Sequence, residues 1–329
     1  SRHGIVLSKN ELAKSFGIKT GESILTARQK CPELELVPSH FDKYIKYSRL
    51  ANEIYFGFTD KVEPFGLDEC WLDMTRFKGM YGTDEQVADT IRNTVKKELG
   101  LTVSVGASFN KVFAKLGSDI TKPDTTTVIS SARYKKLIWQ LPVSDLLYVG
   151  KATTAKLQVY NIKTIGDLAK TDRHFLKCIL GKNGVMLWNF ANGNDNSPVA
   201  EYGQFPPVKS IGNGTTAPRD LVSDDDIKIT LLSICESVAA RLREHNCRCR
   251  TVQLLVKDCE FFTYERQYRL SYPTNTTKEI FNIAFSLYKK HHTSGKPVRG
   301  LAVKTSNLSI TANDIVQLSI FPEEMQNIK

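Results

Sequence analysis

Two neighbouring carboxylates, Asp68 and Glu69, are the residues of this sequence best suited to hold a metal ion. On a regular strand adjacent side chains point to opposite faces, so the two share a ligand only where the backbone turns. Gly66 provides the freedom for a tight hairpin or a bulge, and Asp73 is a reserve candidate on the face of Glu69. Both carboxylates would then face one pocket and bind Mg²⁺, which prefers oxygen ligands and phosphate. The alternative interpretation, commoner for an isolated Asp-Glu pair, is two solvated acids at a hairpin tip.

Residues 104–123 form a second candidate site, in this case for phosphate. They combine a strand, a turn rich in serine and asparagine, and a helix that carries Lys111 and Lys115, with Lys122 just beyond it. Turn amides and ammonium groups in such an arrangement can bind phosphate. The spacing of a P-loop is absent, however, and lysines in this pattern more often form a solvated basic face.

The elements around these residues predict a sheet backed by helices. Thr83 and Gln86 form a capping box before an apolar-periodic stretch that Gly100 ends, so we expect a helix between them. Residues 101–107 alternate between apolar and other positions and predict a strand. A helix that leads directly into a strand, after the strand-like residues 62–72, indicates helices layered on a sheet.

The rest of the chain divides into a helical region and a small α+β region. Residues 138–204 predict short helices joined by glycine-bearing turns, and the proline-containing stretch that follows is typical of a linker. Beyond it lies a module with an unusually basic stretch. In this module we expect helices over residues 224–244 and 277–290 and strands over residues 250–258 and 298–310.

Length and charge restrict the class of protein. The chain has 329 residues, with 45 Lys or Arg against 35 Asp or Glu, so its net charge is +10. This length predicts two or more domains, and the positive charge favours a polyanionic partner. No apolar run can span a bilayer, so we expect no membrane partner. The seven cysteines lack zinc spacing and indicate reducing cytosol, with Cys247 and Cys249 interpreted as thiols near a strand edge.

Four blocks of the sequence together resemble the Y-family, or translesion, DNA polymerases. Residues 66–73 (GLDECWLD) are similar to the family's S-I-D-E-x-x-L-D strand, and residues 104–123 to its S-x-G-I-A-x-N-K block and the K-P that closes it. Residues 209–216 (KSIGNGTT) resemble the opening of the family's C-terminal domain, and residues 299–308 resemble its ending. Blocks in this order over nearly all of the chain are far more specific than any one alone. The branch they resemble is the bacterial DNA polymerase IV and UmuC (ImpB/MucB/SamB) type.

The resemblance implies a site for nucleotidyl transfer. Asp68 and Glu69 match two of the family's three catalytic carboxylates, which hold two Mg²⁺ ions. In the family these ions activate the primer 3′-hydroxyl and neutralise charge on the incoming dNTP. Ser8, Lys14 and Lys122 match positions that contact the triphosphate. Glu11 stands where many members have tyrosine, and we place it outside the site because an acid there would repel the phosphates.

The fold implied by the resemblance is an α+β multidomain fold, the right-hand polymerase with a partial palm and fingers, a helix-hairpin-helix thumb and an α+β little finger. The implied boundaries are fingers at residues 1–40, palm at 41–137, thumb at 138–204, little finger at 205–310 and a tail at 311–329. Thumb and little finger would hold the backbone of primer–template DNA. The implied DNA-binding residues are Val149, Gly150, Lys151, Lys156, Lys209, Arg241, Arg248 and Arg250. Taken without the family, an ordinary helix–turn–helix corner fits residues 149–156 equally well.

The tail contains a short motif for a protein partner. Gln317, Leu318, Ile320 and Phe321 resemble the Q-L-x-L-F peptide by which bacterial polymerases dock on the β sliding clamp. An extended segment with apolar anchors can fill a hydrophobic pocket on a partner. Five-residue matches are common by chance, but the position just past the last domain favours this interpretation.

One departure from the family bears on activity. Its members begin with a strand bearing D-x-D-x-F-F, which supplies the third carboxylate, and nothing in residues 1–10 resembles it. We therefore expect either a fragment, which the intact blocks elsewhere favour, or a naturally truncated relative. The predicted function is error-prone translesion DNA synthesis in DNA repair and the SOS response, with poor activity of this chain alone. The alternatives are a non-catalytic DNA- and clamp-binding relative and, with less support, a basic α/β enzyme of other phosphate chemistry.

Overall fold

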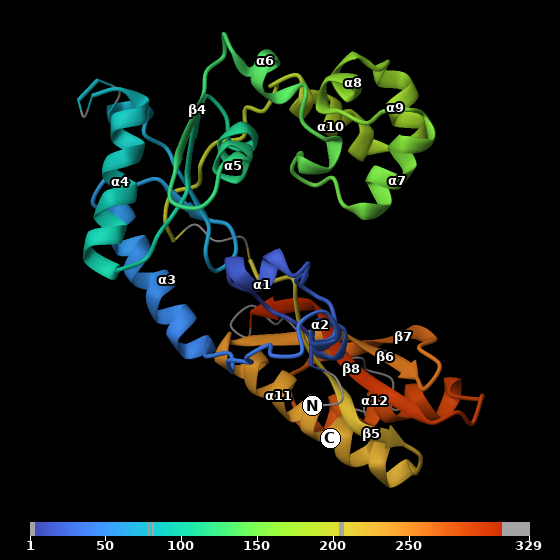
Figure 1. The fold of residues 1–329 in the computed structure, drawn as a ribbon. Coiled ribbons are helices and arrows are strands. Elements are labelled where there is room, and N and C mark those ends of the chain that lie inside the picture. The colour runs from blue at the N-terminus through green and yellow to red at the C-terminus, as the bar shows by residue number, and fades with distance from the viewer. Residues whose placement is uncertain (1–3, 78, 81, 204–206, 311–329) are drawn as a thin grey trace. The chain divides into compact units, whose positions relative to one another are not determined.

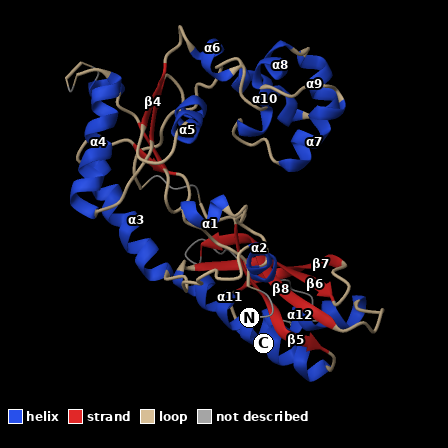
Figure 2. Cartoon of the chain, viewed as in Figure 1, coloured by secondary structure: helices blue, strands red, loops and turns tan. Residues whose placement is uncertain are grey.

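The computed structural model describes residues 4–77, 79–80, 82–203 and 207–310 (Figure 1). The chain divides into two compact units, of which one comprises residues 38–205 and the other residues 1–37 with 206–329. The first unit combines helices with two short pairs of strands, and the second is built on a long four-stranded sheet (Figure 2). This mixture of helices and sheets agrees with the predicted α+β class.

An antiparallel hairpin carries the candidate carboxylates in the unit of residues 38–205. Helix α3 (Phe41–Phe56) precedes strand β1 (Val62–Pro64), which pairs with β2 (Cys70–Leu72). No residue of α3 is buried, although the helix contains many aromatic and aliphatic side chains. The apolar positions of this helix are thus only partly covered.

Helix α4 (Asp84–Leu99) has both of the ends that the sequence predicts. Thr83 and Gln86 form the reciprocal capping box, and Gly100 ends the helix with a left-handed φ of +66°. Both signals are local, because a cap needs only residues within one turn of the helix end.

Strand β3 (Val105–Ser108) and strand β4 (Thr126–Ile129) run parallel, joined by helix α5 (Lys111–Ile120). The sequence predicts a strand over residues 101–107, but β3 begins only at Val105. Within the described residues β3 pairs only with β4, and the first residue of β4, Thr126, lies opposite Val105. Gly106 lets α5 pack directly on β3, since a Cβ atom there would lie 2.0 Å from the carbonyl oxygen of Ala114.

Short helices complete this unit, as the sequence predicts for residues 138–204. Phe113 of α5 shares one core with Leu157, Ile165 and Leu176, which are all fully buried. The helices are α6 (Tyr134–Ile138), α7 (Lys151–Val159), α8 (Ile165–Lys170), α9 (Arg173–Leu180) and α10 (Lys182–Ala191).

Residues 4–37 form a small helical segment of the other unit. Helix α1 (Glu11–Ser15) is capped by the side chain of Asn10, and helix α2 (Ile24–Lys30) by that of Ser23. Val6, Ile18 and Ala27 form its buried centre.

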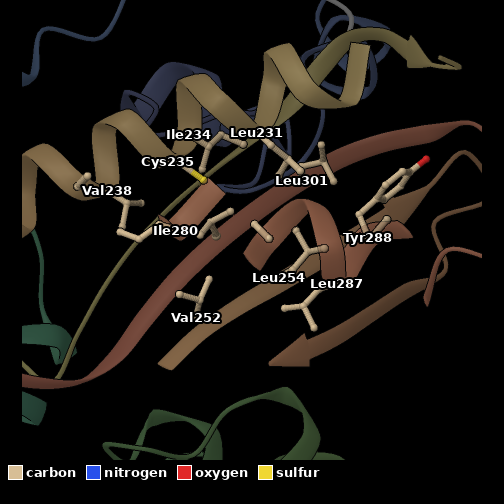
Figure 3. Packing of buried hydrophobic residues seen from close by; sticks show 14 of the residues in the cluster. Leu231, Ile234, Cys235, Val238, Val252, Leu254, Ile280, Leu287, Tyr288 and Leu301 are labelled. Atoms are coloured by element: carbon tan, nitrogen blue, oxygen red, sulfur yellow. The ribbon is translucent and has the colours of Figure 1, made fainter. Parts of the chain in front are cut away.

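A four-stranded antiparallel sheet with helices on one face forms the C-terminal module. Helices α11 (Asp224–Glu244) and α12 (Thr277–His291) pack against each other and cover that face (Figure 1). Figure 3 shows Leu231 of α11 and Ile280 of α12 directed toward Leu254 of the sheet. The strands are β5 (Ser210–Leu221), β6 (Cys247–Asp258), β7 (Thr263–Thr274) and β8 (Val298–Ile310), in the spatial order β5-β8-β6-β7.

The structure corrects two expectations for this module. The sequence predicts β6 and β8 but not β5 and β7, which lie at the sheet edges and are mostly exposed on both faces. Cys247 and Cys249 do not lie near a strand edge, because β6 pairs with β8 on one side and β7 on the other. Both residues are buried, and burial raises the pKa of the Cys249 thiol to about 12.

The core of the C-terminal module should depend on Leu231. This residue of α11 is fully buried, and Leu231→Ala should lower the free energy of unfolding by about 2–5 kcal/mol because it leaves a cavity. Ile229 of the same helix is 71% exposed, so Ile229→Ala is the matched control and should have little effect. Urea denaturation followed by far-UV circular dichroism measures both, and equal losses would contradict the packing described for α11.

Candidate active site and nucleic-acid interface

The turn between β1 and β2 has the bend that the Asp-Glu pair requires. The Phe65 amide donates a hydrogen bond of 2.8 Å to the carbonyl oxygen of Glu69, and Gly66 between them has a φ of +83°. Few residues other than glycine adopt such a backbone readily. Asp68 is exposed in the turn, and Glu69 is half-buried just before β2 begins. The bend is therefore confirmed, while metal binding by the pair stays a prediction.

Helix α5 places a lysine against the second carboxylate. The Lys115 Nζ lies 3.2 Å from Glu69 Oε1, and only 16% of its side chain is exposed. Lys115 also pairs with Asp119 one turn later, and Asp119 Oδ1 lies 2.7 Å from Lys122 Nζ. Glu69, Lys115, Asp119 and Lys122 thus form a row of alternating charges, which we call the charge ladder.

Ion pairs within the charge ladder keep Lys115 and Asp119 ionised despite partial burial. Desolvation disfavours the charged form of Lys115, but its bonds to Asp119 and its attraction to Glu69 outweigh this and raise its pKa. Burial likewise opposes ionisation of Asp119, yet hydrogen bonds from Lys115 and Lys122 lower the pKa of that carboxyl. Lys115 and Asp119 consequently both carry a charge at neutral pH.

Two other candidates have structural partners. Lys111 Nζ lies 2.6 Å and 2.7 Å from the two carboxylate oxygens of Glu63, and it also lies 4.5 Å from the centre of the Trp71 ring. Asp73 accepts a hydrogen bond from the Thr75 amide and pairs with Lys61 at 3.5 Å. Both therefore serve the packing of the hairpin, and Asp73 is dropped as a reserve metal ligand.

A separate ion-pair cluster holds the loop that follows Lys122. Asp124 has a left-handed φ of +54°, and its carboxylate lies 2.7 Å from Arg92 Nη1 and 2.6 Å from Lys96 Nζ of α4. Hydrogen bonds from Lys96 and then Arg92 hold the pKa of Asp124 below its ordinary value. Through this cluster α4 fixes the loop next to Lys122, a lysine whose side chain is half exposed.

The oxygen donors of the hairpin suit a hard cation such as Mg²⁺, but only in part. Asp68 and Glu69 supply two consecutive carboxylates. In the described part of the chain, no group of three or more His, Cys, Asp or Glu residues is placed so that it could hold a metal ion. The donor chemistry therefore fits, and a further ligand is required.

The predicted nucleotide contacts of the first residues lie in the other unit. Ser8 and Lys14 are both exposed, and Lys14 Nζ lies 3.3 Å from Glu11 Oε2 within α1. Glu11, which we expected outside the site, therefore partly neutralises Lys14. The nucleotide contacts of Ser8, Lys14 and Lys122 stay predictions.

The predicted thumb residues form a tight turn into α7. Gly150 is the N-cap of this helix and provides no side chain to bind the first amides, while Val149 is buried beneath the turn. Lys151 and Lys156 are exposed on α7. Uncapped amides and nearby ammonium groups are suited to a phosphate.

The strands of the C-terminal module separate the predicted arginines. Arg248 and Arg250 alternate along β6 with the buried Cys247 and Cys249, so they lie on the face away from the helices. We call this the open face. Arg241 lies on α11, where its Nη1 donates to the carbonyl oxygen of Gly212 at 2.9 Å, at the outer strand β5. Arg241 is thus not brought together with the other two.

Register reveals basic residues of the open face that the sequence analysis misses. Lys304 of β8 lies beside Gln253 of β6, and Arg269 of β7 beside Thr251. Small residues pair next to them: Gly214 of β5 lies beside Ala302 of β8, where a Cβ atom on Gly214 would lie 2.5 Å from that of Ala302. The open face is therefore rich in basic residues; alternation in β7 would have revealed Arg269 if that strand had been predicted.

Two further observations concern partners. Gln317, Leu318, Ile320 and Phe321 lie outside the described residues. Within the described residues, no helix combines the length and the hydropathy that crossing a membrane requires.

Comparison with protein families gives three matches. Residues 1–119 match the impB/mucB/samB family, residues 208–320 the C-terminal domain of that family, and residues 144–195 the thumb domain of DNA polymerase-iota.

Full-length relatives and solved structures agree with these matches. The chain is 48% identical to DNA polymerase IV of Acetivibrio thermocellus, covering 100% of this chain and 82% of the relative. It is 37% identical to DNA polymerase IV of Clostridium acetobutylicum, covering 98% and 80%. A Y-family DNA polymerase chimera of Dbh and Dpo4 has a TM-score of 0.81 at 22% identity, covering 94% of this chain and 88% of the chimera. The predicted α+β multidomain polymerase fold is thereby confirmed.

Stability in acid should depend on Asp124. Because its pKa is lowered by folding, its contribution is full above the ordinary aspartate pKa of about 4 and is lost as the pH falls through the folded-state value. The free energy of unfolding should therefore fall in acid, and Asp124→Asn should flatten that fall. Urea unfolding between about pH 2 and 7 measures it. Asp60→Asn, at a mostly exposed position, is the control, and identical slopes for parent and Asp124→Asn would refute the role of the cluster.

Proposed function

The chain belongs to the impB/mucB/samB family of Y-family DNA polymerases, and we propose that it adds deoxynucleotides to a primer opposite damaged template bases, in error-prone translesion synthesis. The observation that carries this proposal is the 48% identity to a DNA polymerase IV over the whole chain. DNA repair and the SOS response are the setting we propose for it. The domain boundaries predicted from the sequence are part of the same proposal.

Asp68 and Glu69 are proposed to hold two Mg²⁺ ions. Such ions would supply charge neutralisation and a more acidic primer 3′-hydroxyl. The hairpin contributes an exposed carboxylate at Asp68 and a second one at Glu69, which pairs with Lys115 at 3.2 Å. The hydrogen bond from the Phe65 amide to the Glu69 carbonyl oxygen closes the turn in which the two residues lie.

Lys122 is proposed to bind the triphosphate of the incoming dNTP. Its ammonium group contacts the Asp119 carboxylate at 2.7 Å, so a phosphate would replace an anion that is already present there. Lysine offers a point charge rather than a two-pronged contact, so it neutralises phosphate without fixing its orientation. Ser8 and Lys14 would add contacts from the first residues of the chain.

A third carboxylate is proposed to come from a further strand beside the hairpin. In the described residues β2 pairs only with β1, and β3 only with β4, so each pair keeps an unpaired edge. Helix α3, which has no buried residue, also has apolar surface available for packing. These features support the hypothesis that a strand bearing D-x-D-x-F-F completes the palm.

Primer–template DNA is the proposed partner of the thumb turn and the open face. Val149, Gly150, Lys151 and Lys156 would contact the duplex backbone through amides and ammonium groups. Lys209 precedes β5, and Arg248 and Arg250 belong to the open face. Contacts of this kind are insensitive to base identity and weaken steeply with salt.

A second candidate function is a non-catalytic DNA- and clamp-binding relative. The observation that favours it is the presence of only two hairpin carboxylates, with no larger metal-binding cluster in the described residues. The two candidates differ in chemistry but not in DNA affinity, so primer extension separates them.

Asp68→Ala should abolish primer extension in a version of the protein extended by the D-x-D-x-F-F strand. The rate should fall to about 1% of the parent or less, because loss of one preorganised charge-stabilising group costs about 10²–10³ in rate. The dissociation constant for primer–template should change by less than about twofold, since phosphate contacts supply affinity. Asp60→Ala, at an exposed carboxylate outside the hairpin, is the control. Full activity of Asp68→Ala would remove Asp68 from the site, and no activity of the extended parent would favour the non-catalytic candidate.

The β sliding clamp is a proposed partner of the tail. Joint replacement of Leu318 and Phe321 by alanine should weaken clamp binding at least about tenfold, because two apolar anchors are lost. Ser319→Ala, within the same motif, is the matched control and should bind as the parent does. Surface plasmon resonance with immobilised clamp measures the affinities, and an unchanged affinity of the double variant would show that the motif has no role.

A further inference from the structure

A rigid turn at one end of the open face presents two exposed phenylalanines. Phe261 is 63% exposed and Phe262 is 67% exposed, in the loop between β6 and β7. The buried Asp258 carboxylate accepts hydrogen bonds of 2.9 Å from the amides of Glu260 and Phe262. Further backbone bonds join the Asp258 amide to the Phe262 carbonyl and the Phe261 amide to the Asp258 carbonyl. The turn is therefore held from within.

Phe261 adopts a backbone conformation that is unusual for its type. Its φ is +68°, a left-handed value that bulky residues seldom adopt. A strained residue of this kind persists where the surrounding structure determines it, and it is a reason to look for function. Here the strain places a large apolar ring in solvent rather than in a core.

Two cations lie against the ring of Phe261. The Arg299 guanidinium carbon is 4.6 Å from the ring centre, and Lys257 Nζ is 5.8 Å from it. Lys257 alternates with buried neighbours on β6 and belongs to the open face, and Arg299 of β8 is next to Gly300, which pairs with Lys257. Arg299 is itself fixed by Asp220 at 3.7 Å, and only 17% of its side chain is exposed. One side of the ring thus faces a fixed cation, and the exposed remainder is accessible.

We propose that Phe261 stacks on an unpaired base of a DNA strand that leaves the duplex at this end of the open face. The inference rests on the proposed function, because it assumes that the open face lies along DNA. An aromatic ring beside Arg and Lys suits a nucleic acid strand, since the ring stacks on the base while the cations attract the phosphates. A protein pocket or a second copy of the chain would instead have to accommodate the positive charge of Lys257 and Arg299.

Abasic oligonucleotides separate stacking from phosphate contacts. The 329-residue chain is titrated against a fluorescein-labelled blunt duplex, the same duplex with a single-stranded overhang, and the same overhang with abasic sites. The parent should bind the base-bearing overhang about tenfold more tightly than the abasic one, the change that one stacked base produces. Phe261→Asn should abolish this difference and leave affinity for the blunt duplex unchanged. Asparagine tolerates the left-handed backbone, so the variant removes the ring and keeps the turn.

Control variants and outcomes keep the inference distinct from the proposed function. Tyr268→Ala removes another exposed aromatic ring. Tyr268 pairs with the buried Val252 and therefore lies on the opposite face of the sheet, so this variant should bind as the parent does. Phe261→Trp should retain the preference, and its indole fluorescence should be quenched by the base-bearing overhang only. The inference is overturned if Phe261→Asn retains the preference for the base-bearing overhang. It is also overturned if light scattering shows that the parent is a dimer and that this variant is a monomer. If the parent binds the blunt duplex without preferring bases, only the inference fails; if it binds no DNA, the proposed function fails as well.

Discussion

The ion pair between Lys115 and Glu69 is the interaction on which the candidate site depends. It joins the hairpin turn to helix α5, two segments separated by more than forty residues, and both side chains are partly shielded from water. Removal of Lys115 would leave the partly buried Glu69 carboxylate without this partner, which costs more than the pair itself contributes. Because Lys115 also contacts Asp119, and Asp119 contacts Lys122, one lysine links the proposed metal-binding carboxylate to the proposed phosphate-binding lysine.

Backbone constraints make this ion pair possible. Gly66 permits the turn that keeps Asp68 and Glu69 together, and Gly106 permits α5 to approach β3 closely enough to bring its lysines to the hairpin. A side chain at Gly106 would push the helix outward by the width of a methyl group, which exceeds what a hydrogen-bonded ion pair tolerates. The glycine-containing block therefore serves the geometry of the site although neither glycine has a functional group.

Sequence reasoning succeeds where the signal is local and fails where pairing between distant residues decides. The capping box at Thr83 and the stop at Gly100 need no tertiary contact, and both are present. Strands β5 and β7 are polar edge strands, and they exist because β8 and β6 offer them hydrogen-bonding edges. The sequence suggests Lys115 as a phosphate contact because the residue that it pairs with, Glu69, is distant in the chain and is brought beside it only by folding. Asp68 and Glu69 could not be told from solvated acids without the family resemblance.

Each compact unit contributes its own surface to the proposed activity. Asp68, Glu69 and Lys122 belong to one unit, where the charge ladder connects the second carboxylate to the lysine through Lys115 and Asp119. Arg248 and Arg250 belong to the other unit, on the open face, which the pairing of β6 with β7 and β8 holds in place. Both surfaces are therefore set by contacts within a single unit.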